Sequence, residues 1–390
     1  MVMNIANDNI SPISTTLPLN AELEVSSLAR LFHETTTSYK FVFFLSLLDI
    51  LKRNKFQAGE PILFRDLTVE MLANSWYPHT YFRLSFGRQD QITAKLDSLP
   101  LEIGEPILKF RDPDKKLLRA TIGRHTLDHS LMRFVPFRLL RPFFEDELRG
   151  MPDHKVDAAI IRLTKRDCGA RAPLYSFSDQ RDAILPHPLW TEYLRLHFSL
   201  IQGWAAWHWL EYMQRCNRAV PAISAKLFPP QERSSLRPQI EYWKLVIQLQ
   251  DLKCIYTDSA LNPDRLSLDH FLPWSFVAHD QLWNLVPTFP EINSSKLDHL
   301  PAETYCRRLA RLQHQGLVLT SQRMPQSRWE RVVEPFLADL KLADRGELLD
   351  ERKLTAAYES CVKPQLAIAK SLGFTPNWLY QAGGGGVLNK

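Results

Sequence analysis

Residues 39–53 constrain the fold more than any other segment, because they are apolar on nearly every side of a helix. A helix without a polar face must be surrounded by other elements, so we expect it at the centre of a helical region. Its most apolar part, 41–50, is interrupted by Ser46 and Asp49 and is too short to cross a bilayer. The segment therefore predicts a buried helix and no membrane association.

Further secondary structure is predicted around this helix. Residues 221–238 contain four prolines and cannot continue a helix, so they mark the best candidate boundary between regions. Residues 156–163 are β-branched and apolar and predict a strand. Apolar spacing predicts helices at 22–32, 64–72, 188–215 and 240–249.

These elements give a fold class that is mainly α (α+β), with a helical N-terminal region and C-terminal helices that pack back on a small central domain. The expected parts are a loose N-terminal tail at 1–20, a mainly helical region of unknown role at 21–238, a chemistry-bearing domain at 239–310, and a C-terminal helical region at 311–390 whose end, Gly383–Gly386, is flexible.

Composition restricts the compartment and leaves the partner open. The five cysteines are odd in number and form no CxxC pair, which favours reduced thiols. The N-terminus lacks the charged start and apolar run of a signal peptide. Both observations predict a cytoplasmic protein. The net charge of +5 is compatible with a polyanionic partner but does not require one.

Polar residues gather at the ends of short predicted elements within 266–301. Residues 266–271 predict a strand that ends in Asp269 and His270, and residues 282–286 predict a second strand that carries Asn284. A loop with a proline joins the two strands. A hairpin of this kind would bring the three polar side chains close to each other.

A helix is expected next, with Asn293 as its cap and Lys296 in its first turn. These residue types suit phosphodiester hydrolysis. The hard oxygens of Asp269 and Asn293 can hold Mg²⁺ while leaving positions for phosphate and water. A neutral imidazole on His270 can accept a proton from the attacking water near neutral pH.

With these residues at these spacings, the segment 251–301 resembles the HNH, or ββα-metal, endonucleases. Its spacing is similar to that of the HNH domain of the RNA-guided CRISPR nuclease. The resemblance implies an H-N-N variant in which Asp269 is a metal ligand, His270 the general base, Asn284 the residue that holds the hairpin and orients the histidine, Asn293 the residue that completes the metal site, and Lys296 a group beside the phosphate.

One departure from this family concerns zinc. Many members bind a structural zinc through two CxxC pairs, whereas this chain has only Cys254 in such a place. A four-cysteine site cannot be built, so we expect no structural zinc. The hairpin must instead be held by packing, for which Tyr242, Trp243 and Trp283 are the candidates.

The resemblance implies a metal-dependent HNH endonuclease that hydrolyses DNA and nicks one strand per active site, with Mg²⁺ as cofactor and Mn²⁺ as substitute. Two alternatives stay open, namely a nucleic-acid-binding adaptor with an inactive HNH fold and an RNase. The expected partner is DNA. An analogy with HNH effectors of bacterial antiviral defence adds other proteins of such a system as a hypothesis.

Four other patterns each allow two interpretations. Arg307, Arg308 and Arg311 lie away from the apolar face of a helix and either contact the DNA backbone or form a solvated face. A second pattern alternates arginines with phenylalanines, namely Arg133, Arg138 and Arg141 with Phe134, Phe137, Phe143 and Phe144. It either forms a surface on which the bases of a single strand stack, or it is part of the core with arginines that extend to solvent. Trp204, Trp207 and Trp209 suit base stacking or burial, and His125, Asp128 and His129 would need a fourth ligand to bind a metal.

Overall fold

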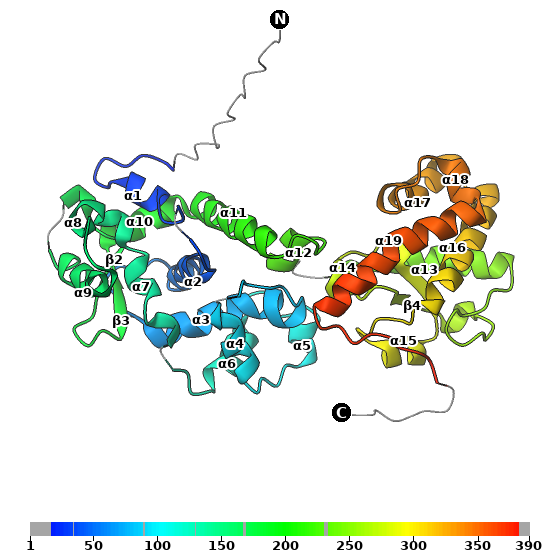
Figure 1. Cartoon of the computed structure of the whole chain (residues 1–390), viewed down its shortest axis with the longest axis horizontal. Helices are drawn as coiled ribbons and strands as arrows, with labels where there is room; N and C mark the ends of the chain where they lie inside the picture. The colour runs from blue at the N-terminus through cyan, green and yellow to red at the C-terminus, as the bar shows by residue number, and fades with distance from the viewer. Residues whose placement is uncertain are drawn as a thin grey trace, which may run out of the picture. The chain divides into compact units, whose positions relative to one another are not determined.

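The computed structural model describes residues 17–381 apart from 34, 89, 129, 167–168 and 230–232, and of residue 170 only the backbone (Figure 1). The described chain divides into two compact units. The first comprises Met1–Thr80 and Ser85–Arg218, and the second comprises Tyr81–Leu84 and Ala219–Lys390. The second unit thus begins before the boundary expected at 238/239. Helices dominate both units, which confirms the prediction of a mainly α chain.

The two ends of the chain fall largely outside the described residues. This applies to 1–16 of the expected tail and to the glycine run at 383–386. Where the description begins, Leu17 is buried, and Tyr193 donates a hydrogen bond to the carbonyl oxygen of Pro18 at 2.7 Å. These first described residues are therefore packed onto the first unit.

Helix α2 (Tyr39–Arg53) is the centre of the first unit, as the sequence predicts. Ten of its residues are buried, and α3, α7, α10 and α11 pack against it. A small antiparallel sheet of order β1-β3-β2, which the sequence did not indicate, pairs Ile62 with Ile184 and Ser176 with Leu185. The elements are α1 (Val25–Ala29), β1 (Ile62–Leu63), α3 (Phe64–Trp76), α4 (Gln91–Ser98), α5 (Glu105–Leu108), α6 (Lys116–Gly123), α7 (Val135–Arg138), α8 (Glu145–Leu148), α9 (Asp153–Leu163), β2 (Tyr175–Phe177), β3 (Ala183–Pro186), α10 (Pro188–Leu196) and α11 (Phe198–Cys216).

The strand predicted at 156–163 is wrong, because this segment belongs to helix α9. Its buried residues follow the i, i+3, i+4, i+7 spacing of one helix face. They are Val156, Ala159, Ile160 and Leu163. Burial of this face outweighs the weak preference of β-branched residues for strands.

Two predicted helices have different bounds in the structure. The helix predicted at 188–215 is divided at His197 into α10 and α11, and no proline or glycine marks this position. Both halves pack on α2, so tertiary packing accounts for the break better than local sequence does. The helix predicted at 22–32 is limited to α1.

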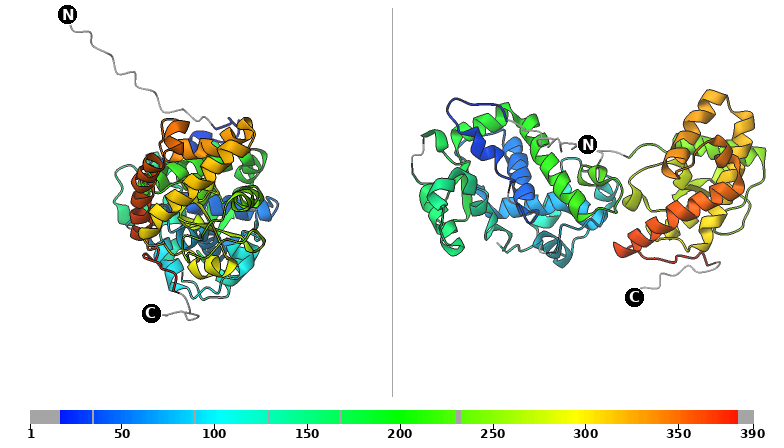
Figure 2. Two further views of the ribbon diagram at one scale, coloured as in Figure 1. Left: turned by 90° about the vertical axis from the view of Figure 1, so that its right-hand side faces the viewer. Right: turned by 45° about the horizontal axis from the view of Figure 1, so that its top comes forward.

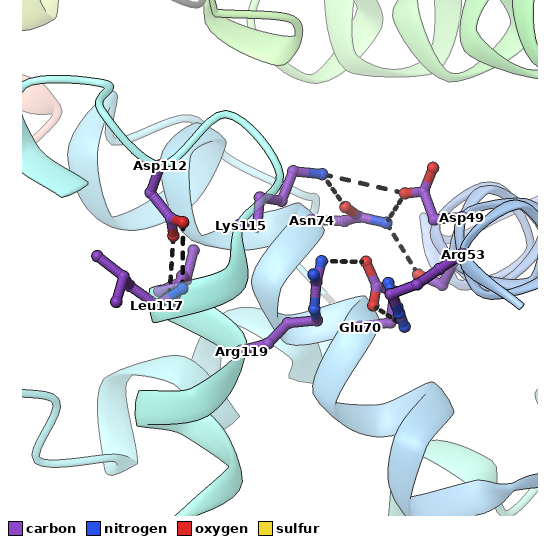
Figure 3. Close-up of polar contacts among 10 residues, drawn as sticks. Asp49, Arg53, Glu70, Asn74, Asp112, Lys115, Leu117 and Arg119 are labelled. Carbon is purple, nitrogen blue, oxygen red and sulfur yellow. Dashed lines mark hydrogen bonds and ion pairs between the residues drawn. The ribbon is translucent and has the colours of Figure 1, made fainter. Parts of the chain in front are cut away.

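A buried polar cluster joins α2, α3 and α6 in the first unit (Figure 3). The carboxylate of Glu70, whose residue is 1% exposed, forms ion pairs with Arg53 at 2.9 Å and Arg119 at 3.3 Å. One turn further along α3, Asn74 donates a hydrogen bond to Asp49 at 3.0 Å. Because the charged groups of this cluster have partners, it fixes how the three helices pack.

In the second unit, an antiparallel hairpin is followed directly by a helix. Strand β4 (Ser267–His270) pairs with β5 (Leu285–Thr288), and α15 (Pro290–Lys296) packs on β4. The other helices are α12 (Ile223–Leu227), α13 (Arg237–Leu249), α14 (Trp274–Val277), α16 (Thr304–Arg323), α17 (Gln326–Asp339), α18 (Arg345–Leu349) and α19 (Glu351–Ser371).

Three details of the predicted hairpin and helix are corrected. Asn284 precedes the second strand, in the 3₁₀ turn Leu282–Asn284. Asn293 lies within α15 and does not cap it, and Lys296 is the last residue of that helix. The helix starts earlier than predicted because Pro290, which needs no partner for a backbone N–H, occupies its first position.

The C-terminal helices pack back on the hairpin, as predicted. Helices α16 and α19 run side by side in the views of Figures 1 and 2 and contact each other. Gln313 of α16 donates to the carbonyl oxygens of Leu282 and Leu285 at 3.0 Å, and Tyr358 of α19 donates to that of Trp283 at 2.8 Å. These side chains thereby connect both helices to the backbone at the start of the second strand.

The segment Tyr81–Leu84 is part of the second unit although it lies far away in sequence. Phe82 is fully buried, with its ring centroid 5.9 Å from that of Trp274 in α14. Arg83 forms an ion pair with Asp298 at 2.9 Å, and its guanidinium lies 4.1 Å from the centroid of the Phe374 ring. These contacts make the segment a structural component of the unit that contains the hairpin.

Candidate active site

The end of strand β4 places Asp269 in a nearly closed environment. The residue is 2% exposed, with Lys296 Nζ 3.1 Å from one carboxylate oxygen, and Tyr256 donates its hydroxyl to the other at 2.7 Å. Burial, reinforced by the charge of Asp269, raises the pKa of Tyr256 well above its ordinary value, so the phenol stays protonated. An ionised carboxylate offers about four lone pairs, so these contacts leave acceptor capacity for a further cation.

Lys296 connects Asp269 to the neighbouring backbone. Its side chain is fully buried, and besides the ion pair its ammonium group donates to the carbonyl oxygen of His270 at 2.7 Å. A buried ammonium group needs such partners because its desolvation is costly. The sequence predicts this lysine beside the phosphate, whereas in the structure it forms a buried ion pair with Asp269.

Asn293 lies on α15 next to the same strand. Its amide nitrogen donates to Ser267 Oγ at 2.9 Å and to the backbone oxygen of Leu268 at 3.1 Å. A backbone oxygen can only accept, so the contact with Leu268 decides which side of the amide carries the NH₂ group. Within the described ranges the side-chain amide oxygen of Asn293 accepts no hydrogen bond, which leaves it available as a ligand.

His270 forms a pair with Asp280, a residue that the sequence did not single out. Its Nε2 lies 2.8 Å from the Asp280 carboxylate. Burial on its own would raise the pKa of Asp280, but the hydrogen bond and charge of His270, with the charge of Arg233, outweigh it and hold this pKa below its ordinary value. An ionised carboxylate only accepts, so Nε2 carries the proton and Nδ1 of the neutral ring is a base.

Asn284 holds the loop that follows the first strand. Its side chain is fully buried, accepts from the backbone N–H of Leu272 at 2.8 Å and donates to the carbonyl oxygen of the same residue at 2.9 Å. The loop between His270 and the second strand is thereby fixed at its beginning. The hydrogen bonds of the Asn284 side chain are thus made to the backbone two residues after His270.

A second histidine, His279, precedes Asp280 and differs from His270 in its surroundings. Burial lowers the pKa of His279 to about 4, and its ring lies 5.3 Å from that of Trp283. The backbone N–H of Gln281 donates to its Nδ1 at 3.3 Å. His279 is therefore neutral at physiological pH and serves as packing for the loop that carries Asp280.

The chemistry of the donor set fits a hard divalent cation. In the part of the chain that the structure describes, no three histidine, cysteine or acidic side chains converge as a metal cage. Asp269 and Asn293 supply one carboxylate and one amide oxygen from adjacent elements. Mg²⁺ is typically bound by one or two carboxylates and completes its shell with water and substrate phosphates, so a sparse oxygen set suffices.

Comparison with known proteins identifies this part of the chain. Residues 254–302 match the family model of the HNH endonucleases. This segment is an HNH endonuclease domain. It contains the hairpin, α15 and all of the polar groups from Asp269 to Lys296. The protein is therefore a nuclease, a phosphodiester hydrolase whose substrate is a nucleic acid, and members of this family depend on a metal ion. No solved structure matches the chain.

Cys254, at the start of the HNH domain, is fully buried and lies with its Sγ 3.2 Å from Thr288 Oγ1. The core around the hairpin also contains Tyr242, Trp243 and Trp283, the three residues proposed to replace a zinc as its support. Apolar packing of this kind can stabilise a small domain without a metal. The absence of structural zinc stays a prediction.

The three arginines that follow the HNH domain lie on the outer face of α16, and each is paired with an acid. Arg307 contacts Glu359 at 2.7 Å, and Arg311 contacts Glu351 at 3.3 Å. Arg308 contacts Asp258 at 3.0 Å. Exposed pairs of this kind contribute little to stability, so a phosphate could replace the acidic partner at small cost.

The remaining sequence patterns are placed as follows. Trp204 and Trp209 are buried, whereas Trp207 is 58% exposed. His129 lies outside the described residues, and Asp128 is paired with Lys95, so the metal site considered there gains no support. Among the described residues, no helix is both long and apolar enough to cross a membrane.

Proposed function

We propose that the HNH domain hydrolyses DNA with a divalent cation, Mg²⁺ as the natural ion and Mn²⁺ as a substitute, and that each active site cuts one strand. The observation that carries the proposal is the pairing of His270 with Asp280 next to the oxygen donors Asp269 and Asn293. A base whose tautomer is fixed, beside hard ligands, is what hydrolysis of a phosphodiester requires.

In this mechanism His270 accepts a proton from the attacking water on Nδ1. Asp280 keeps the other ring proton on Nε2 and stabilises the imidazolium that forms. Lys296 holds the Asp269 carboxylate and the His270 backbone in one arrangement, so the base and the ligand keep a fixed relation. The water oxygen bonds to phosphorus as the bond to the 3′ oxygen breaks, and the 3′ oxygen takes up a proton from solvent, which gives 5′-phosphate and 3′-hydroxyl ends.

A cation held by Asp269 and Asn293 would neutralise charge on the phosphate and on the leaving oxygen. Loss of one neutral oxygen donor should weaken cation binding without abolishing it. Asn293→Ala should therefore need more Mg²⁺ for the same rate, whereas Asp269→Ala should not be rescued by added metal. Cleavage measured against Mg²⁺ concentration separates these two outcomes.

The deciding experiment is incubation of the purified protein with supercoiled plasmid, linear duplex or RNA, in Mg²⁺ or in EDTA. Metal-dependent nicking of the plasmid supports the proposal. Binding without cleavage in Mg²⁺ or Mn²⁺ would identify an adaptor with an inactive HNH fold. Cleavage of RNA alone would identify an RNase.

We also propose that Arg307, Arg308 and Arg311 contact the DNA backbone after releasing their acidic partners. Changing Arg307 and Arg311 to Ala should weaken binding to all sequences alike and reduce the salt slope of log Kd by about 2, because fewer counterions are released. Arg328→Ala, an exposed site on α17, is the matched control. An unchanged slope in the double variant would leave the arginines as a solvated face.

The biological setting is proposed by analogy alone. A cytoplasmic effector of bacterial antiviral defence, with other proteins of that system as partners, fits a metal-dependent nuclease joined to a large helical unit. Copurification of other proteins with the chain from its native host would test this part of the proposal.

A further inference from the structure

The first unit contains a large pocket that the proposed nuclease chemistry does not use. Its volume is about 1340 Å³, and its walls come mainly from the segments 30–33, 35–40, 130–142 and 145–156. Sites for one small molecule usually measure about 300–1000 Å³. The pocket is therefore large enough for several linked groups.

The charge of this pocket is strongly positive. Among the described residues, its lining includes six cationic side chains and two carboxylates, Glu145 and Asp153. The cations are Arg30, Lys40, Arg133, Arg138, Arg141 and Arg149. Asp153 is itself shared by two of these arginines, at 3.0 Å from Arg138 and 2.6 Å from Arg141. An excess of this size favours a polyanionic occupant.

The ion pairs in the pocket are open to replacement. Asp153 is 66% exposed, and the side chains of Arg138 and Arg141 are each more than one third exposed. Pairs with such access to water contribute little, so a phosphate can take the place of the carboxylate. Arg133 has no acidic partner among the described residues, which leaves its guanidinium for a ligand.

Phe134 supplies an aromatic surface among these charges. It is 42% exposed, and the guanidinium groups of Arg133 and Arg138 lie 4.9 Å and 4.7 Å from the centroid of its ring. Phe143 and Phe144, from the same sequence pattern, are buried in the core. Phe137 is partly buried, with its ring centroid 4.8 Å from that of Phe177, so of the four phenylalanines of the pattern Phe134 is the one that is exposed at the pocket.

We propose that this pocket binds a single-stranded segment of nucleic acid, with phosphates held by the arginines and a base stacked on Phe134. Proteins that bind single strands combine a basic groove with aromatic stacking platforms, and both are present here. The proposal goes beyond the nuclease function, because it assigns a nucleic-acid site to the unit that lacks His270. It does not depend on whether the HNH domain cuts DNA.

The test is fluorescence anisotropy of the full-length protein with a labelled oligothymidylate of about 12 nucleotides, in EDTA so that no cleavage occurs. Phe134→Leu should weaken binding by roughly tenfold, since stacking of one base contributes about 1–3 kcal/mol. Arg133→Gln should reduce the salt slope by about 0.7, the value for one phosphate of a single strand. Matched controls are Trp207→Leu and Arg162→Gln, exposed residues of the same unit outside the pocket.

Each outcome has a definite meaning when plasmid cleavage in Mg²⁺ is measured on the same preparations. Weaker oligonucleotide binding by the two pocket variants, with melting temperatures and the two controls unchanged, supports the proposal. Equal affinity of all variants would overturn it. Displacement of the strand by thymidine monophosphate at similar concentration, or equal binding of a duplex through Phe134, would also overturn it. His270→Ala should abolish cleavage and leave this affinity unchanged, so failure of the nuclease proposal is recognised separately.

Discussion

Each unit of the protein contains a buried carboxylate held by cations, but the two differ in what surrounds them. Glu70 in the first unit is neutralised by Arg53 and Arg119, whose side chains are 41% and 18% exposed. Asp269 in the second unit is neutralised by a lysine that is fully buried. Glu70 lies in the middle of a helix among partnered groups, as Figure 3 shows, whereas Asp269 is the last residue but one of strand β4, on which the helix that carries Asn293 packs.

The comparison teaches that a buried ion pair does not by itself indicate chemistry. Such pairs occur wherever helices are fixed against each other, and their net contribution to stability is often small. What distinguishes the second unit is the neighbourhood of Asp269, which includes His270 and Asn293, the residues that we propose as base and metal ligand. The following predictions separate the structural carboxylate from the one beside the reactive groups.

The largest effect is expected at His270. His270→Ala should lower the rate of nucleic-acid cleavage by roughly 10²–10⁴-fold, the usual contribution of a positioned base. The loss of one hydrogen bond should change the free energy of unfolding by only about 1 kcal/mol. Cleavage rate and thermal unfolding are to be measured on the same sample. If this variant cleaves at the wild-type rate, the assignment of His270 and of the active site is wrong.

The opposite result is expected for Glu70. Glu70→Gln leaves two arginines facing a neutral amide and should lower the free energy of unfolding by about 3 kcal/mol, the lower end for a broken buried pair because both arginines reach solvent. Cleavage per folded molecule should stay at the wild-type level. If this variant folds normally but cuts slowly, the distinction between the two carboxylates fails.

Asp280 tests whether the carboxylate beside the base acts through the histidine. Asp280→Asn should lower kcat by roughly 10–100-fold with little change in KM, as is usual for residues that orient a reactive group. A purely structural role would instead lower thermal stability and leave kcat per folded molecule unchanged.

Lys226 is buried and has no ion pair with a carboxylate among the described residues. Its replacement should have a smaller effect on stability, and this effect should depend on pH. Lys226 donates to the carbonyl oxygen of Phe276, and burial lowers its pKa from 10.5 to about 7. Between these values the unfolded chain binds more protons, so the native protein should gain stability as pH rises from about 7 to 10.5. Lys226→Met should lack this gain. Denaturant unfolding at several pH values checks it, and parallel stability curves would contradict it.

The smallest effect is expected at Cys254. Because no second cysteine accompanies it in the HNH domain, Cys254→Ser should fold and cleave nearly normally. Burial of the serine hydroxyl should lower the free energy of unfolding by no more than about 1–2 kcal/mol, since Thr288 offers it a hydrogen-bond partner. Elemental analysis of the wild type should show no stoichiometric zinc, and one tightly bound zinc per chain would refute the prediction.

The parts of the fold that follow from local pattern were predicted well from the sequence. Helix α2 has the predicted bounds because an apolar surface on all sides permits only a central helix. The segment 156–163 was predicted wrongly because its β-branched residues also fit one buried helix face. Here residue type and spacing point to different structures, and packing decides.

The candidate site likewise has a part that could be predicted from the sequence and a part that could not. The spacing of Asp269, His270 and Asn293 is a property of a short hairpin and helix, so the sequence contains it. The position of Asp280 depends instead on the path of the loop, which turns through a left-handed backbone at Ala278 with φ of 55°. Alanine has no preference for that conformation, so no residue type indicates the turn. The pairing of Asp280 with His270 therefore could not be predicted from the sequence and is seen only in the structure.

The position of Tyr81–Leu84 within the second unit determines how the protein can be made. These residues leave the ribosome long before the hairpin exists, and the contact of Phe82 with Trp274 can form only after Trp274 has been synthesised. The two units therefore cannot fold strictly in order of translation, as separate domains of a chain usually do. A gene fragment that starts at Ala219 would encode the reactive groups but leave a vacancy where Phe82 is buried. Assembly of the nuclease is thus coupled to synthesis of nearly the whole chain.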